Sequence, residues 1–222
     1  MIRAFAPALL ALALTACGSL VPEGRAPAKP QLSTPRPVAV TPAARQCLTT
    51  LSANGAAFTP VSDRYYGAGC STVGTVSLSA LHGDSASFGL TNLGPVACPL
   101  AETTAAWARY GVDRAARQVL GSPLARIETF GSYSCRDVAG SGRRSAHATA
   151  NAIDISAFVL ADGRRISIIG DWSAGDPAEQ RFLRLVHASA CKRFGTVLGP
   201  DYNAAHKDHL HVESGSRGGF CR

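Results

Sequence analysis

Apolar residues recur near helical spacing in two stretches of the chain. Residues 99–120 predict one helix, with Trp107 on its apolar face and Gly111 as a point where it could be interrupted. A second helix is expected over residues 177–194, because Asp176 is a good N-cap residue and a proline follows at the first helical position. The glycine after residue 194 predicts its end.

Four other stretches are rich in β-branched and apolar residues and predict strands. The turn pair Asp162 and Gly163 separates two of them, so these two are expected to form a hairpin. Together the elements predict an α+β fold, with a small antiparallel sheet flanked by helices. The predicted strands are residues 126–133, 152–160, 165–169 and 209–213.

The N-terminus has the pattern of an export signal. Residues 1–16 hold a basic start and an apolar run, and a small residue precedes Cys17, which is typical of a bacterial lipoprotein signal. The alternative is a plain cleaved signal with an incidental cysteine. Residues 18–46 hold six of the 13 prolines and no aromatic residue, so we expect residues 17–46 to be a lipidated cysteine and an extended linker. The folded domain is expected over residues 47–222.

Composition and charge limit the partners that the protein is expected to bind. The chain has 222 residues and a net charge of +7, but the predicted domain keeps 17 basic against 14 acidic residues, or +3. The arginine pairs at 143–144 and 164–165 have no interleaved aromatic residues, so nucleic acid is not an expected partner. A membrane is expected only through the lipid on Cys17. The residue after that cysteine is Gly18, which is not the usual inner-membrane retention residue, so a periplasmic lipoprotein of the outer membrane is favoured.

Six cysteines remain after Cys17, and an even number in an exported chain predicts three disulfides. Their scattered spacing lacks the close pairs of a zinc ribbon or a thioredoxin-like site. Fifteen pairings are possible, and the sequential one is the working prediction. It joins Cys47 with Cys70, Cys98 with Cys135, and Cys191 with Cys221.

Histidines and aspartates cluster in two short segments, and this is the strongest sign of chemistry. His209 and His211 are two residues apart, so on a strand both rings would approach one centre. Asp154 lies between two isoleucines, where a carboxylate must be paired, ligated or protonated. Two imidazoles and a carboxylate form a three-ligand set that suits one Zn²⁺ ion per domain and leaves a position for water. Each residue alone has a structural alternative, such as an arginine partner for the aspartate, and His82 and His187 are expected to have structural roles only.

The sequence resembles the bacterial extensin-like C-terminal domain family, and more distantly the zinc peptidases of bacterial cell walls, which include D-alanyl-D-alanine carboxypeptidases and murein endopeptidases. The distant likeness rests on a histidine, an aspartate seven residues later, and an Asp-His-x-His segment near the C-terminus. The matching stretches are residues 131–136 (GSYSCR), 145–147 (SAH), 152–155 (AIDI), 182–184 (FLR), 191–194 (CKRF), 198–203 (LGPDYN) and 206–211 (HKDHLH).

The resemblance implies a role for each matching residue. It makes His147, Asp154 and His211 the metal ligands, and Asp208 the general base that takes a proton from water, with His209 as the competing candidate. Arg136 matches the arginine that stabilises the oxyanion, or it forms a structural ion pair. The remaining polar residues of these stretches are expected to support the site. They are Ser145, His206 and Glu213.

Ala150 departs from the peptidase pattern, which commonly has glycine at this position, so the local loop geometry is in question.

Two function classes follow from these patterns. The first is an envelope lipoprotein whose zinc-dependent peptidase domain hydrolyses an amide involving D-amino acids in peptidoglycan stem peptides or cross-links. The second is a non-catalytic module that binds peptidoglycan or acts as a scaffold and retains the metal site. The sequence indicates no oligomeric state.

Overall fold

The computed structural model describes residues 41–215 and 219–222 of the chain. The predicted signal, Cys17 and the linker as far as residue 40 lie outside the described residues. Helix α1 (Pro42–Ala53) starts inside the predicted linker, where the hydroxyl of Thr41 accepts a hydrogen bond of 3.1 Å from the backbone N–H of Ala44. The last residues of the predicted linker are thus helical, because the proline at 42 begins a capped helix.

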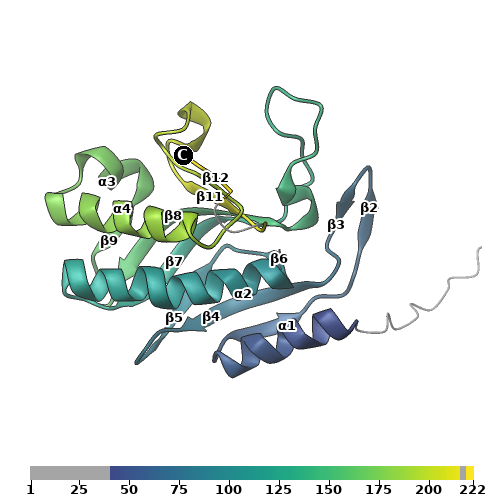
Figure 1. The fold of residues 1–222 in the computed structure, drawn as a ribbon, viewed down its shortest axis with the longest axis horizontal. Helices are drawn as coiled ribbons and strands as arrows, with labels where there is room; N and C mark the ends of the chain where they lie inside the picture. Colours follow the sequence, from purple (N-terminus) through teal and green to yellow (C-terminus); the bar gives the residue numbers. More distant parts are fainter. Residues whose placement is uncertain (1–40, 216–218) are drawn as a thin grey trace, which may run out of the picture. The chain divides into compact units, whose positions relative to one another are not determined.

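Within residues 41–215 and 219–222, ten strands form one mixed sheet (Figure 1), and the expected small antiparallel sheet is wrong. The order is β1-β4-β5-β7-β8-β11-β10-β12, with β6 on β4 and β9 on β8, and β2 pairs separately with β3. The β5–β7 and β10–β12 pairs are parallel. The strands are β1 (Ala57–Pro60), β2 (Tyr65–Gly67), β3 (Cys70–Ser71), β4 (Thr75–His82), β5 (Ser87–Thr91), β6 (Pro95–Ala97), β7 (Leu124–Gly131), β8 (Ala152–Leu160), β9 (Arg165–Ser167), β10 (Thr196–Leu198), β11 (Leu210–Glu213) and β12 (Phe220–Cys221).

The α+β class is confirmed, and the four predicted strands correspond to β7, β8, β9 and β11. Strand β8 has the predicted bounds and is buried at every position, as expected for a central strand. It pairs antiparallel with β9 across the turn at Asp162 and Gly163, where the glycine has φ +89°. The predicted hairpin is therefore confirmed.

The predicted helix over residues 99–120 is continuous. It consists of α2 (Cys98–Trp107) followed by π-helical turns η1 (Ala108–Asp113) and η2 (Ala116–Leu120). Gly111 does not interrupt it but lets another helix approach, since a Cβ there would lie 2.2 Å from the hydroxyl of Ser189. Only glycine fits at this contact.

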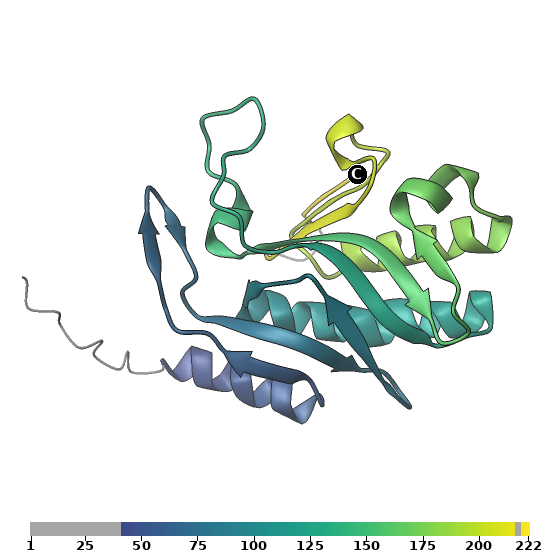
Figure 2. The same cartoon turned by 180° about the vertical axis from the view of Figure 1, so that it is seen from behind.

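Helix α4 (Pro177–Cys191) begins at the predicted N-cap, Asp176, which forms a capping box with Glu179. Figure 1 shows α2 and α4 in front of the sheet, and the reverse view in Figure 2 shows the sheet in front of them. The core lies between these layers, where the Trp107 ring contacts Phe158 of β8. The short helix α3 (Ile168–Ala174) follows β9 directly, so the last part of the predicted strand 165–169 is helical.

Three disulfides join the described cysteines, but two of the predicted pairings are wrong. Cys191–Cys221 is confirmed, whereas the other bonds are Cys47–Cys98 and Cys70–Cys135. The packing of the helices explains the observed pairing. Cys47 lies on α1, and α1 packs against α2, which begins at Cys98. Cys98 rather than Cys70 is therefore close enough to bond with Cys47. No helix of the described segments is long and apolar enough to cross a membrane.

We expect peptide mapping of the oxidised protein to recover the Cys47–Cys98 and Cys70–Cys135 links. The Cys47→Ala/Cys98→Ala double variant should lose about 4 kcal/mol of unfolding free energy, because the bond closes a long loop in the unfolded chain. Chemical denaturation measures this loss. A peptide joining Cys47 to Cys70 would contradict the pairing.

Candidate metal centre

Three buried side chains from three different elements converge on one point. They are His147 on η3 (Ala146–Thr149), Asp154 on β8 and His211 on β11, and their exposed fractions are 2%, 9% and 6%. Oδ1 of Asp154 lies 3.2 Å from Nε2 of His147 and 2.8 Å from Nδ1 of His211. The two histidine nitrogens are 3.2 Å apart. The structure thus brings together the three residues that the resemblance implied as metal ligands.

The local folding of each segment explains this convergence. Strands β8 and β11 pair with His211 directly opposite Asp154, so their side chains project from the same face of the sheet. Ser145 caps η3, and its hydroxyl accepts a hydrogen bond of 3.3 Å from the backbone N–H of His147. Ala150 ends this turn in the left-handed conformation with φ +54°, so alanine here adopts a backbone conformation that glycine enters more easily.

Each histidine has an acceptor for its outer nitrogen. Nδ1 of His147 donates to the carbonyl oxygen of Ser132, and Nε2 of His211 lies 2.9 Å from the Glu213 carboxylate. When these outer nitrogens carry the protons, the inner nitrogens present lone pairs toward the Asp154 carboxylate. This is the outer-shell arrangement that orients histidine ligands in metal sites.

The ionisable side chains of the cluster shift one another's pKa values. Burial alone would raise the pKa of Asp154, but hydrogen bonds from His147 and His211 hold it well below its usual range. Burial alone would lower the pKa of His211, but its bonds to Asp154 and Glu213 raise it to about 9. The hydrogen bond to His211 lowers the pKa of Glu213. Both carboxylates therefore remain charged at neutral pH and favour a positive charge between them.

The residues present fit a divalent metal ion. The three inner ligand atoms all lie within 4.8 Å of one another. They are two imidazole nitrogens and one carboxylate oxygen, a mixed set that suits zinc. Without a metal, the doubly protonated His211 ring donates from Nδ1 to Oδ1 of Asp154. A cation that replaced this proton would be bound by all three inner atoms.

His209 lies beside the cluster and connects it to Asp208. Nε2 of His209 is 3.4 Å from Oδ1 of Asp154, and its Nδ1 is 2.8 Å from Oδ1 of Asp208. Strand β11 begins only at Leu210, so the alternation of a strand does not set the directions of these two side chains. The structure therefore places the His209 ring, rather than the Asp208 carboxylate, next to Asp154.

His206 and Arg136 complete the surroundings. His206, on η4 (Ala204–His206), places its ring 5.2 Å from that of His209, and burial together with the neighbouring histidines lowers its pKa to about 4. Its Nδ1 bonds to Oδ1 of Asn203. Nη2 of Arg136 lies 3.8 Å from Oδ2 of Asp154, and the arginine side chain is 47% exposed. The residues expected to hold the metal, to act in catalysis or to support the site thus lie close together, whereas Cys17 lies outside the described residues.

Comparison with known families identifies the domain. Residues 45–222, about four fifths of the chain, match the family described as extensin-like protein C-terminus. The chain belongs to this family. No curated protein and no solved structure matched it. The match begins at residue 45, within helix α1, which starts at Pro42.

Two contributors to the site of the extensin-like domain were not predicted. The Ser132 carbonyl that orients His147 is a backbone atom, so no residue type marks it in the sequence. Asn203 accepts from both the His206 ring and the backbone N–H of Ala205, which makes it the N-cap of η4. The only sign of this role in the sequence was the residue type, because asparagine is a preferred N-cap residue.

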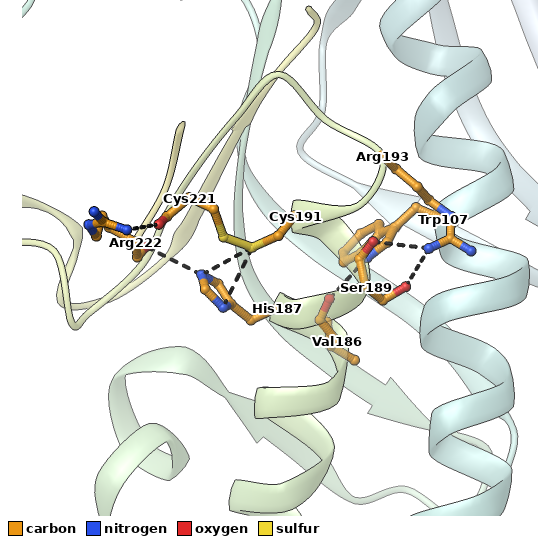
Figure 3. Close-up of a disulfide and its surroundings, with 8 residues drawn as sticks. All are labelled: Trp107, Val186, His187, Ser189, Cys191, Arg193, Cys221 and Arg222. Carbon is orange, nitrogen blue, oxygen red and sulfur yellow. Dashed lines mark hydrogen bonds between the residues drawn. A yellow bond between two sulfur atoms is a disulfide. The ribbon is translucent and has the colours of Figure 1, made fainter. Parts of the chain in front are cut away.

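Among the described residues, a second group with metal-ligand chemistry is His187, Cys191 and Cys221. Figure 3 shows the His187 ring beside the disulfide that joins the two cysteines, with Nδ1 3.9 Å from Sγ of Cys191. Both sulfurs are used by that bond, and Nε2 of His187 faces the carbonyl oxygen of Arg222. The structural role expected for His187 agrees with these contacts.

We expect the metal-free extensin-like domain to bind one equivalent of Zn²⁺ in calorimetric titration. His211→Ala should abolish this binding, because it removes a nitrogen ligand. Glu213→Gln should weaken it about tenfold or more, because the outer nitrogen of His211 loses its charged acceptor.

His82→Ala is the matched control, since His82 bonds to the carbonyl oxygen of Gly83 and takes no part in the cluster. Unchanged zinc affinity in His211→Ala would show that the ion is held elsewhere.

Proposed function

We propose that this protein is an exported lipoprotein whose extensin-like domain is a zinc-dependent peptidase. Its substrate would be an amide bond involving D-amino acids in the stem peptides or cross-links of peptidoglycan. The observation that carries the proposal is the joint position of His147, Asp154 and His211 with His209 beside them. A structural zinc site would more often draw on thiolates, and all six domain cysteines are in disulfides.

Zinc bound by the three ligand residues would supply Lewis-acid activation of water and of an amide carbonyl. The chain's own residues would manage the protons. His209 is suited to accept a proton at Nε2 and to return it to the departing amine. The Asp208 carboxylate accepts from Nδ1 of the same ring, so it would orient His209 and stabilise its charged form. The proposal therefore makes His209 the base and Asp208 its positioning partner.

Arg136 would stabilise negative charge on the substrate carbonyl oxygen. Its guanidinium is a rigid, planar group of N–H donors, and Nη2 lies 3.8 Å from Oδ2 of Asp154. Because nearly half of its side chain is exposed, it is accessible from the solvent side of the cluster. The same contact serves as the structural ion pair that the sequence left as an alternative.

The second candidate function is a non-catalytic module that binds or organises peptidoglycan. One observation favours it: the cluster balances its own charge, because a protonated His211 bonds to both Asp154 and Glu213. Such a self-satisfied cluster would be stable without performing chemistry.

Incubation of the zinc-loaded protein with muropeptides, followed by mass analysis of the products, tests the catalytic proposal. His209→Ala should lower kcat by about 10²–10⁴-fold while the bound zinc is retained, because proton transfer is lost but the ligands remain. Asp208→Asn should have a smaller effect on kcat, since the base is present but poorly oriented. Full activity of His209→Ala would assign the base to another residue, and no cleavage by the unaltered protein would favour the non-catalytic module.

The membrane anchor is proposed from the sequence alone. Replacing the thiol by a hydroxyl in Cys17→Ser should release the protein from the membrane fraction, because it removes the acceptor for the lipid. Fractionation and labelling with radioactive palmitate measure this change. Membrane association that persists in the variant would contradict lipidation at Cys17.

A further inference from the structure

An exposed phenylalanine lies beside the candidate metal centre. Phe130, near the end of β7, is 56% exposed and does not belong to the hydrophobic core of the described residues. The centroid of its ring lies 6.0 Å from that of the His209 ring, with the two planes at 72°. An apolar ring that remains in water gives up the stabilisation that burial would supply. The packing of the fold therefore does not account for a phenylalanine at this position.

The register of β7 on β8 places Phe130 on the same face of the sheet as the cluster. Thr129 pairs with Ile155, and Gly131 pairs with Asp154, so β7 advances by two residues where β8 advances by one. Phe130 is the extra residue of this β-bulge, and the bulge sets both Phe130 and Gly131 against Asp154. Gly131 has no side chain. Phe130 is therefore the side chain that this end of β7 presents beside the cluster.

A peptide held for proton transfer would come close to this ring. For His209 to return a proton to the departing amine, the amine nitrogen must lie within about 3 Å of Nε2. The residue that supplies this amine begins its side chain at the carbon bonded to that nitrogen. Its side chain therefore starts within a few ångströms of the imidazole that Phe130 contacts.

The chemistry of the phenyl ring limits which side chain can lie against it. The ring offers neither a hydrogen-bond donor nor a positive charge, so a carboxylate placed there would lose water without gaining a partner. An apolar group gains instead, because it covers ring surface that is now in contact with water. An ammonium group on the ring face is the competing choice. The positive charge of a metal ion in the cluster would oppose it.

We propose that Phe130 determines the specificity of the site by contacting an uncharged, apolar side chain on the residue that supplies the departing amine. This inference rests on the proposed function and specifies its substrate. The preferred amide would carry an apolar rather than an acidic side chain on its amine side. Phe130 would act on substrate choice, while His209 manages the proton.

Two acetylated dipeptides that differ in the second residue test this role. They are N-acetyl-D-alanyl-D-alanine and N-acetyl-D-alanyl-D-glutamate, and NMR titration in the presence of chelator measures the Kd of each without turnover. The unaltered protein should bind the alanyl peptide about tenfold more tightly than the glutamyl peptide. Phe130→Ala should remove this preference by weakening the alanyl peptide alone, Phe130→Leu should keep it, and Phe130→Lys should reverse it.

Tyr110→Ala is the matched control. Tyr110 is 44% exposed, and its ring contacts the guanidinium groups of Arg109 and Arg114 on the same helix rather than the cluster. This variant should keep the preference of the unaltered protein. Thermal melts of each variant establish that the fold persists.

The ratio of the two Kd values separates a contact with the substrate from a structural role. Equal weakening of both dipeptides in Phe130→Ala would overturn the proposal, because it would mean that the ring only holds His209 in place. Equal binding of the two dipeptides by the unaltered protein, or binding of neither, would also overturn it. So would tighter binding of a dipeptide that ends in D-lysine. The expected preference without any cleavage of muropeptides would contradict only the peptidase function.

Discussion

The buried carboxylate of Asp154 is the constraint on which the site depends. Strand β8 is buried at all nine positions, and a charge placed there costs several kcal/mol unless other groups compensate it. The neighbours along the strand are isoleucines, so compensation must come from elsewhere in the chain. Helix η3 supplies His147, strand β11 supplies His211, and the loop after β7 supplies Arg136. The cluster therefore holds together four segments of the chain, of which β11 is far from the other three in sequence.

The sequence predicted those parts of the fold that carry a strong local signal. Strand β8 and the turn at Gly163 were predicted correctly, and so was the capped start of α4 at Asp176. Most of the strands between residues 57 and 97 have only two to five residues, too few to show a periodic pattern, so their identity depends on partners far along the chain. Strand β4 has eight residues and was missed as well. The wrong disulfide pairings have the same origin, because helix packing decides that Cys47 meets Cys98.

The site could be predicted further than the fold, because residue type and spacing carry its chemistry. The set of His147, Asp154 and His211 came from the resemblance to the zinc peptidases, and these three do converge. Residue spacing alone had grouped His209 with His211 and Asp154, on a strand that in fact begins after His209. The relation of Asp208 to His209 did not, because it depends on where β11 begins: both residues precede Leu210, and a hydrogen bond rather than the pleat orients them. The Ser132 carbonyl was beyond sequence reasoning, since any residue supplies the same atom.

The segment from Ser132 to Arg136 links the cluster to the surface. Within five residues it accepts from the His147 ring, donates to the His147 backbone, bonds covalently to Cys70 and approaches Asp154. A displacement of the β2–β3 hairpin would therefore be transmitted through the disulfide to the carbonyl that orients His147. Cys135 is exposed, so this disulfide adds little to the core. Its physical consequence is that the geometry of the cluster and the position of the hairpin cannot change independently.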